Sequence, residues 1–192
     1  HASRPLNMER MDLEVGPIRI VVEAPLRRLR VLVSDSHGIS CDLVFEGRSF
    51  PIEEPRFVHR VGPRSLMDYT RMTQNGRYTG WLEIDGNRMS AEDFIGTRDR
   101  SWGVRPIGAG DTQPYNPPNS PGIFWIWTPL HFEDRSIFFH VIEDAAGKPW
   151  NVRSVVVPDG SGPSEFLETD QASIDLVLAQ GTRHAASAMI TI

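Results

Sequence analysis

The chain contains almost no cysteine, since Cys41 is the only one among 192 residues. A disulfide within the chain is therefore impossible, which suits a reducing compartment, and we expect a cytoplasmic protein. Alternation in "ISCDLVFEG" places Cys41 on the same strand face as Leu43 and Phe45. This position is typical of a small core residue rather than a nucleophile.

Long hydrophobic runs and a strong excess of one charge are also absent. No apolar run approaches the roughly 18 residues of a membrane-spanning helix, and no signal peptide is visible. We therefore expect no membrane span. The net charge of −5 argues against broad binding to nucleic acid. The chain begins at His1 and ends in "SAMITI", which has the pattern of a mid-strand segment, so we expect that a longer parent has lost residues at one or both ends.

The common signatures of catalysis and metal binding are missing. The sequence has no G-x-S-x-G, P-loop, G-x-G-x-x-G, H-E-x-x-H or C-x-x-C motif. Its histidines show no H-x-H or H-x₃-H spacing of the kind that holds a metal ion. We expect neither a metal nor another cofactor. The six histidines stand at positions 1, 37, 59, 131, 140 and 184.

Short alternating runs separated by turn residues dominate the chain and predict an all-β, antiparallel protein. "LMDYTRMT" and "RYTGWLEI" flank "QNG", and Asn75-Gly76 suits the positive φ angles of a tight turn, so we expect a hairpin there. "DSHG" and "DGN" predict two further turns, and 95–105 has the pattern of another strand. Helical patterning is scarce: "NMERMDLEV" could form a turn or two, and "ASIDLVLAQ" fits either helix or strand. Many strands with hairpin turns indicate a sandwich or a barrel.

Two aromatic strands are apolar on both faces. Alternation places Ile123, Trp125 and Trp127 on one face of "GIFWIWTP", and Phe138, His140 and Ile142 on one face of "RSIFFHVIED". Such strands fit a β-barrel that encloses a ligand cavity, and they fit the packed core of a sandwich equally well. Both alternatives stay open.

Two polar side chains fall on mostly apolar strand faces. His140 is either a buried histidine satisfied by one hydrogen bond or a proton carrier inside a cavity. Asp68 shares a face with Thr70 and Met72, where a carboxylate needs a cation, and the arginines of the segment 98–105 could supply one. Asp68 is then either half of a structural ion pair or an active-site carboxylate.

The segment "GTRDRSWGVRPIG" concentrates charge between glycines. Strand alternation places Arg98, Arg100 and Trp102 on one face and Asp99, Ser101 and Gly103 on the other, and a bulge at Gly103 would change the face of Arg105. An arginine that reaches Asp99 would favour its charged form. The segment is therefore either a bidentate structural clamp or a charged part of a site.

The same segment, with "FWIWTPLHFED" and "FFHVIEDAAGKPWN" after it, resembles the AttH and carotenoid 1,2-hydratase superfamily of lipocalin-like proteins. "VEAPLRRLRVLVSDSHGISCDLVFEGRSFPIEEP" and "DYTRMTQNGRYTGWLEIDG" are similar to a bacterial branch with two lipocalin-like halves. The likeness covers about residues 17 to 156. It implies antiparallel lipocalin-like β-barrels, with two incomplete barrel halves packed together as one form. We expect a first barrel portion at 1–108, a Pro/Gly-rich connecting loop at 109–121 and a second barrel portion at 122–192.

The resemblance also implies an apolar cavity for a hydrophobic small molecule of isoprenoid or polyene type. Cofactor-independent hydratase, isomerase or cyclase activity is one alternative. A non-catalytic carrier, or a structural domain of a larger protein, is the other, and a homodimer is a further expectation. Asp99 matches the family's candidate proton donor, but Arg100 stands where a histidine often follows it. The candidate catalytic residues are Asp99 and His140. The candidate ligand-binding residues are Asp68, Trp81, Arg98, Trp102, Arg105, Trp125, Trp127 and Phe138.

Overall fold

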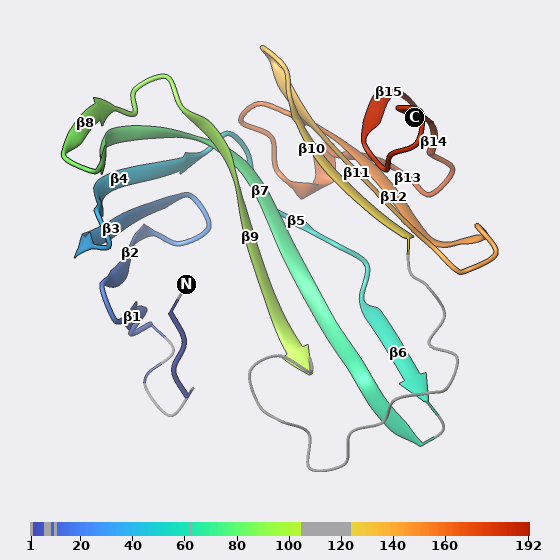
Figure 1. The fold of residues 1–192 in the computed structure, drawn as a ribbon, viewed down its shortest axis with the longest axis horizontal. Helices are drawn as coiled ribbons and strands as arrows, with labels where there is room; N and C mark the ends of the chain where they lie inside the picture. The colour runs from blue at the N-terminus through green and yellow to red at the C-terminus, as the bar shows by residue number, and fades with distance from the viewer. Residues whose placement is uncertain (1, 6–8, 10, 62, 105–123) are drawn as a thin grey trace. The chain divides into compact units, whose positions relative to one another are not determined.

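The computed structural model describes residues 2–5, 9, 11–61, 63–104 and 124–192 (Figure 1). In this part of the chain the regular structure is strand throughout, apart from the short 3₁₀ helix η1 (Pro163–Glu165). No described helix is long and apolar enough to cross a membrane. The strands are β1 (Glu14–Val15), β2 (Ile18–Ala24), β3 (Arg28–Ser36), β4 (Ile39–Gly47), β5 (Ile52–Glu53), β6 (Phe57–Val61), β7 (Arg64–Ile84), β8 (Asn87–Ser90), β9 (Ile95–Val104), β10 (Phe124–His131), β11 (Arg135–Glu143), β12 (Pro149–Pro158), β13 (Leu167–Thr169), β14 (Ser173–Leu178) and β15 (Ala185–Thr191).

The strands form three sheets. The largest follows the order β1-β2-β3-β4-β7-β5, with β6, β8 and β9 also paired to β7. A second sheet has the order β10-β11-β12-β13, and β14 pairs with β15 in a third. The strand pairs with a defined register are antiparallel. The predicted all-β, antiparallel fold class is confirmed, and these sheets agree with a lipocalin-like β fold.

The chain divides into two compact units that are interleaved in sequence. Unit 1 comprises residues 1–52 and 73–99, and unit 2 comprises 53–72 and 100–192. These units do not coincide with the expected portions 1–108 and 122–192. Residues 53–72, which include β6 and the first part of β7, belong to unit 2. The expected connecting loop at 109–121 lies outside the described residues. The assignment of one barrel to each portion stays a prediction.

The hairpin expected at "QNG" is wrong, because β7 runs without a turn from Arg64 to Ile84. The two side chains before the glycine, Gln74 and Asn75, both make long-range hydrogen bonds within unit 1. Gln74 is buried, and its Nε2 donates to the carbonyl oxygens of Leu26 at 2.7 Å and Ser49 at 2.9 Å. The Asn75 side chain accepts a hydrogen bond from Thr97 Oγ1 at 2.7 Å. These long-range bonds override the local turn preference of Asn-Gly.

Gly76 serves packing rather than a turn. A Cβ at this position would overlap the ring of Phe45 and lie 2.6 Å from the carbonyl oxygen of Glu46. Phe45 is buried, contacts Tyr78 edge-on with ring centroids 5.4 Å apart, and belongs to the core of unit 1 with Leu29 and Cys41. Glycine therefore stands in mid-strand because the neighbouring strand passes too close for a side chain.

The other predicted turns of unit 1 are confirmed. "DSHG" connects β3 to β4 with positive φ at His37 and Gly38, and "DGN" connects β7 to β8 with positive φ at Asp85 and Gly86. Cys41 is buried as expected, and burial raises the pKa of its thiol. A raised pKa disfavours the thiolate, so Cys41 acts as a core residue.

The expected strand at 95–105 is confirmed as β9, and Gly103 lies where it passes closest to β7. Gly103 has φ +131°, and a Cβ there would overlap the carbonyl of Asp68 and lie 2.6 Å from the Cα of Tyr69. Both the backbone angle and the close approach require glycine. The part of this strand in unit 2 therefore packs directly on the part of β7 that holds Tyr69.

In unit 2, β10, β11 and β12 lie side by side (Figure 1). The strand alternation predicted for β11 is confirmed by its contacts. Phe139 and Val141 pack with Ala172 in a core that also contacts Ile174 and Ile190 of the third sheet.

The segment "ASIDLVLAQ", which fitted either helix or strand, forms the strand β14. No helix forms in the described residues of "NMERMDLEV". The opposite face of β11 presents Phe138, His140 and Ile142, and the candidate site lies there.

Candidate functional site

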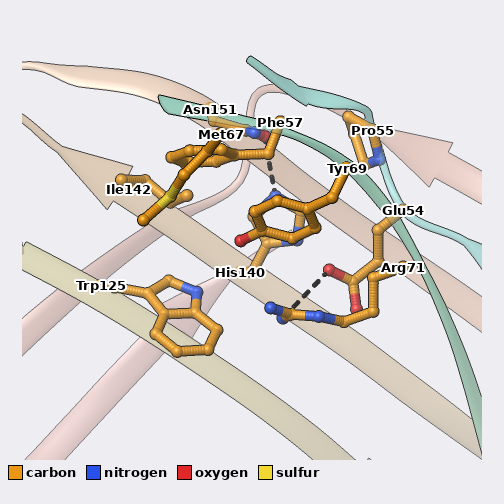
Figure 2. Close-up of a pocket in the computed structure, with 10 residues that line it drawn as sticks. All are labelled: Glu54, Pro55, Phe57, Met67, Tyr69, Arg71, Trp125, His140, Ile142 and Asn151. Atoms are coloured by element: carbon orange, nitrogen blue, oxygen red, sulfur yellow. Dashed lines mark hydrogen bonds and ion pairs between the residues drawn. The ribbon is translucent and has the colours of Figure 1, made fainter. Parts of the chain in front are cut away.

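A cavity of about 200 Å³ lies within unit 2, between its segment 53–72 and the sheet of β10, β11 and β12 (Figure 2). One side is provided by β7 and the residues just after β5, and the other by the alternating side chains of three adjacent strands. The lining is mostly apolar, with four polar residues among it. The lining residues are Glu54, Pro55, Phe57, Met67, Tyr69, Arg71, Trp125, His140, Ile142 and Asn151.

Strand register explains how the sheet side of the cavity is assembled. Trp125 pairs with Ile142, and Trp127 pairs with His140, so these four side chains share one face of β10 and β11. On the opposite wall Phe57 stacks on Tyr69 with ring centroids 5.1 Å apart. Trp125 remains half exposed, whereas His140 and Ile142 are buried. The cavity therefore has an aromatic wall, with Trp125 as its solvent-accessible part.

A buried ion pair closes one end of the cavity. Arg71 Nη1 lies 3.4 Å from Glu54 Oε2, and both side chains are more than nine-tenths buried. The backbone also joins them, since the Glu54 amide donates to the Arg71 carbonyl at 2.8 Å. Trp127 Nε1 donates to the other carboxylate oxygen at 3.1 Å. Two donors therefore compensate the Glu54 charge, as a buried carboxylate requires.

The Arg71 guanidinium also lies against aromatic rings of the pocket. Its Cζ is 5.0 Å from the centroid of Trp125 and 5.9 Å from that of Tyr69. A cation over a desolvated ring is stabilised by the ring quadrupole. The arginine is therefore fixed from both sides, by the carboxylate of Glu54 and by the indole of Trp125.

His140 is the buried histidine of the pocket. Its side chain is 3% exposed, and its Nε2 lies 2.8 Å from Asn151 Oδ1. Burial, with smaller opposing and supporting effects from its neighbours, lowers the pKa of the imidazole. Nδ1 is buried without a hydrogen-bond partner among the described residues. His140 therefore makes one hydrogen bond and lines a cavity, and its role as a proton carrier stays a prediction.

Four predicted residues lie at or beside this pocket. Trp125 and His140 line it. Trp127 contacts Phe138 edge-on at 5.8 Å between ring centroids, and Phe138 contacts His140 at 5.6 Å. The two aromatic strands therefore contribute side chains to the lining of a cavity.

Two other predicted residues make structural contacts elsewhere. Asp68 receives a hydrogen bond from Arg56 Nε at 2.6 Å, and this arginine lowers the pKa of the carboxyl. The cation beside Asp68 thus comes from the segment before β6. Trp81 belongs to unit 1, where the guanidinium of Arg88 lies 3.8 Å from its ring centroid.

The described residues of the charged segment, 96–104, do not line the pocket. Asp99 and Trp102 are exposed on β9, and Arg98 is half-buried there. None of the three is among the residues around the cavity. Arg105 lies outside the described residues.

Sequence reasoning missed Glu54, Tyr69, Arg71 and Asn151. One usable signal existed: in "LMDYTRMT" the face opposite Asp68 carries Met67, Tyr69 and Arg71, and an arginine on an apolar face requires a carboxylate. No local pattern identified Glu54 as that carboxylate, because it stands between prolines in "FPIEEPRF". Within the described residues, no group of three or more His, Cys, Asp or Glu side chains could hold a metal ion.

No curated protein and no solved structure matches the chain. One family model matches from the first residue to the last. The chain therefore belongs to the family of unknown function DUF8625, whose model covers residues 1–192.

Proposed function

We propose that this protein binds a small, mostly apolar molecule in the pocket of unit 2. The observation that supports this most is the cavity itself, an aromatic-walled space bordered by a buried histidine with an unused nitrogen. Ligand sites are typically concave and apolar with a few polar groups that fix orientation. Phe57, Met67 and Ile142 supply the apolar surface here, and His140 and Asn151 supply polar atoms.

Cavity size restricts the ligand. An engineered apolar cavity of about 150 Å³ accommodates benzene, and sites for drug-sized molecules begin at about 300 Å³. A cavity of about 200 Å³ therefore suits one ring with a few further atoms, or a short isoprenoid unit. A long polyene would extend past Trp125 into solvent.

The resemblance to the AttH and carotenoid 1,2-hydratase superfamily also favours an apolar ligand. Its candidate proton donor corresponds to Asp99, which is exposed and does not line the cavity. Acid-catalysed hydration by Asp99 therefore has little support in this pocket. Non-catalytic binding, as in a carrier, is the function that the geometry favours.

One observation favours a second candidate, a cofactor-independent isomerase. Nδ1 of His140 is buried without a hydrogen-bond partner among the described residues, so the neutral imidazole has a lone pair that can accept a proton from a bound molecule. Proton removal from one carbon of the ligand and return to another by the same nitrogen would shift a double bond without any co-reactant. Binding is the first step of this reaction as well, so the same experiment tests both candidates first.

The test uses small aromatic and terpenoid fragments, with thermal shift and tryptophan fluorescence as readouts. A ligand at about 100 times its dissociation constant should stabilise the protein by roughly 2.7 kcal/mol. Replacing Ile142 with phenylalanine places extra atoms in the cavity and should abolish this stabilisation. Quenching of Trp125 should accompany binding and be lost in Trp125→Phe.

The matched control is Leu167→Phe, which adds a phenylalanine at a residue that is 67% exposed and outside the pocket. This variant should bind fragments like the parent protein. If Ile142→Phe and Leu167→Phe bind every fragment equally well, the pocket is not the binding site.

A further inference from the structure

The histidine of the pocket defines which kind of polar group a ligand can present. His140 Nε2 faces Asn151 Oδ1 at 2.8 Å. The amide oxygen of asparagine only accepts hydrogen bonds, so Nε2 carries the proton. Because burial lowers the pKa of the ring, it is neutral near pH 7, and a neutral imidazole has a single proton. Nδ1 therefore carries a lone pair and acts as an acceptor.

This acceptor is not satisfied by the protein. Nδ1 of His140 is buried and has no hydrogen-bond partner among the described residues. Buried polar atoms without partners are uncommon, and because the His140 side chain lines the cavity, a ligand that enters it with a small movement of the ring can supply the missing donor. The lone pair of Nδ1 requires an N–H or O–H group from that ligand.

The charges around the pocket indicate that the ligand is neutral. Glu54 already interacts with Arg71 and with the indole N–H of Trp127. Arg71 is likewise held by Glu54 and lies over Trp125. A charged ligand group would lose its hydration and meet a pair whose charges already compensate each other. A neutral donor avoids that cost.

We propose that the pocket of unit 2 selects a small neutral hydroxyl compound, a monocyclic phenol or a cyclic alcohol, whose O–H donates to Nδ1 of His140. Asn151 holds the imidazole in the tautomer that leaves Nδ1 free to accept. Phe57, Met67 and Ile142 contact the hydrocarbon part of the ligand. This inference rests on the proposed binding function and specifies its ligand class.

The experiment compares three probes of nearly equal size by chemical-shift titration: para-ethylphenol, its methyl analogue para-ethyltoluene, and the anion para-ethylbenzoate. A net hydrogen bond corresponds to about a tenfold change in affinity. We expect para-ethylphenol to bind about tenfold more tightly than para-ethyltoluene, and para-ethylbenzoate to bind most weakly. In His140→Leu the preference for the phenol over para-ethyltoluene should disappear.

The outcomes separate this inference from the proposed function. Equal binding of para-ethylphenol and para-ethyltoluene would leave the binding function standing and overturn the hydroxyl assignment. Tighter binding of para-ethylbenzoate would overturn it in favour of recognition by Arg71. If no probe binds, the proposed function and the inference both fail.

A second measurement on the unaltered protein avoids dependence on the folding of His140→Leu. Nitrogen NMR of the imidazole distinguishes a protonated ring nitrogen from one with a lone pair. We expect Nδ1 of His140 to show a lone pair in the free protein and to shift on addition of para-ethylphenol, but not of para-ethyltoluene. A protonated Nδ1 in the free protein would contradict the proposal.

Discussion

Exposed arginine–carboxylate pairs occur in both units, but unit 2 also contains a buried pair whose surroundings differ. In unit 1, Arg28 Nε lies 2.7 Å from Glu23, Arg30 makes a two-pronged contact with Asp42 at 2.7 and 2.5 Å, and Arg88 Nε lies 2.9 Å from Glu83. These pairs lie on the exposed surfaces of strands. In unit 2 the Arg71–Glu54 pair is longer, at 3.4 Å, and almost completely buried beside the pocket.

The comparison shows that burial matters more than distance in identifying a site. Exposed pairs are screened by water and contribute little to stability, even when their geometry is good. A buried pair is costly to desolvate and needs further donors, which Trp127 supplies to Glu54. Such an arrangement next to an unsatisfied histidine marks the pocket as the candidate site, whereas the exposed pairs of unit 1 do not border a cavity of this kind.

The largest expected effect comes from breaking the buried pair. Glu54→Gln removes the buried carboxylate that Arg71 contacts and should lower the free energy of unfolding by about 3–5 kcal/mol. Glu83→Gln, which breaks an exposed pair of unit 1, should change it by less than about 1 kcal/mol. Denaturant unfolding measures both. Equal losses in the two variants would remove the distinction between the buried pair and the exposed pairs.

The next effect concerns close packing in unit 1. Gly76→Ala inserts a methyl group against the ring of Phe45 and the carbonyl of Glu46, and should cost about 1–3 kcal/mol. Gly162→Ala is the control, because its φ is −98° and the nearest atom to a new Cβ is 3.9 Å away. Thermal unfolding should separate the two variants. A tolerated Gly76→Ala would contradict the close approach of Phe45 and Glu46 to this position.

A smaller effect is expected in the pH dependence of stability. The pKa of His140 is lowered in the folded protein from the ordinary value of 6.5, so the unfolded chain binds more protons as the pH falls below that value. Stability should therefore decrease from about pH 6.5 downwards until the folded-state pKa is reached. The charged neighbours of the ring are Glu54, Arg71 and Arg153.

His140→Gln removes this titration and should flatten that part of the stability profile. The control is His184→Gln, which changes an exposed histidine outside the pocket and leaves the environment of His140 unaltered. Chemical unfolding at a series of pH values measures the slopes. The same slope in all three proteins would show that the environment of His140 does not favour the neutral ring.

The smallest effect is expected at Asp99. This residue is exposed on β9 and does not line the pocket, so Asp99→Asn should change stability by less than about 1 kcal/mol and leave fragment binding unchanged. Fragment titration and thermal unfolding measure both properties. Loss of binding in this variant would favour the role that the family resemblance implies for Asp99.

The sequence predicted the strands and part of the pocket because both depend on alternation. Trp125, Trp127 and His140 share a face because adjacent strands bring alternate side chains together, and that rule needs only local information. The pairing of Glu54 with Arg71 depends on how two distant segments meet, and no local pattern contains it. The hairpin predicted at "QNG" is wrong for a related reason. The hydrogen bonds of Gln74 reach Leu26 and Ser49, which are distant in the sequence and cannot be inferred from the local pattern.

The most direct test of the pocket is a crystal structure of the protein grown with para-ethylphenol. The account predicts the ring among Phe57, Met67 and Ile142, with the hydroxyl oxygen at hydrogen-bond distance, about 2.7–3.0 Å, from Nδ1 of His140. A structure in which the cavity contains no phenol at saturating concentration, or in which the hydroxyl points to Arg71 instead, would contradict it.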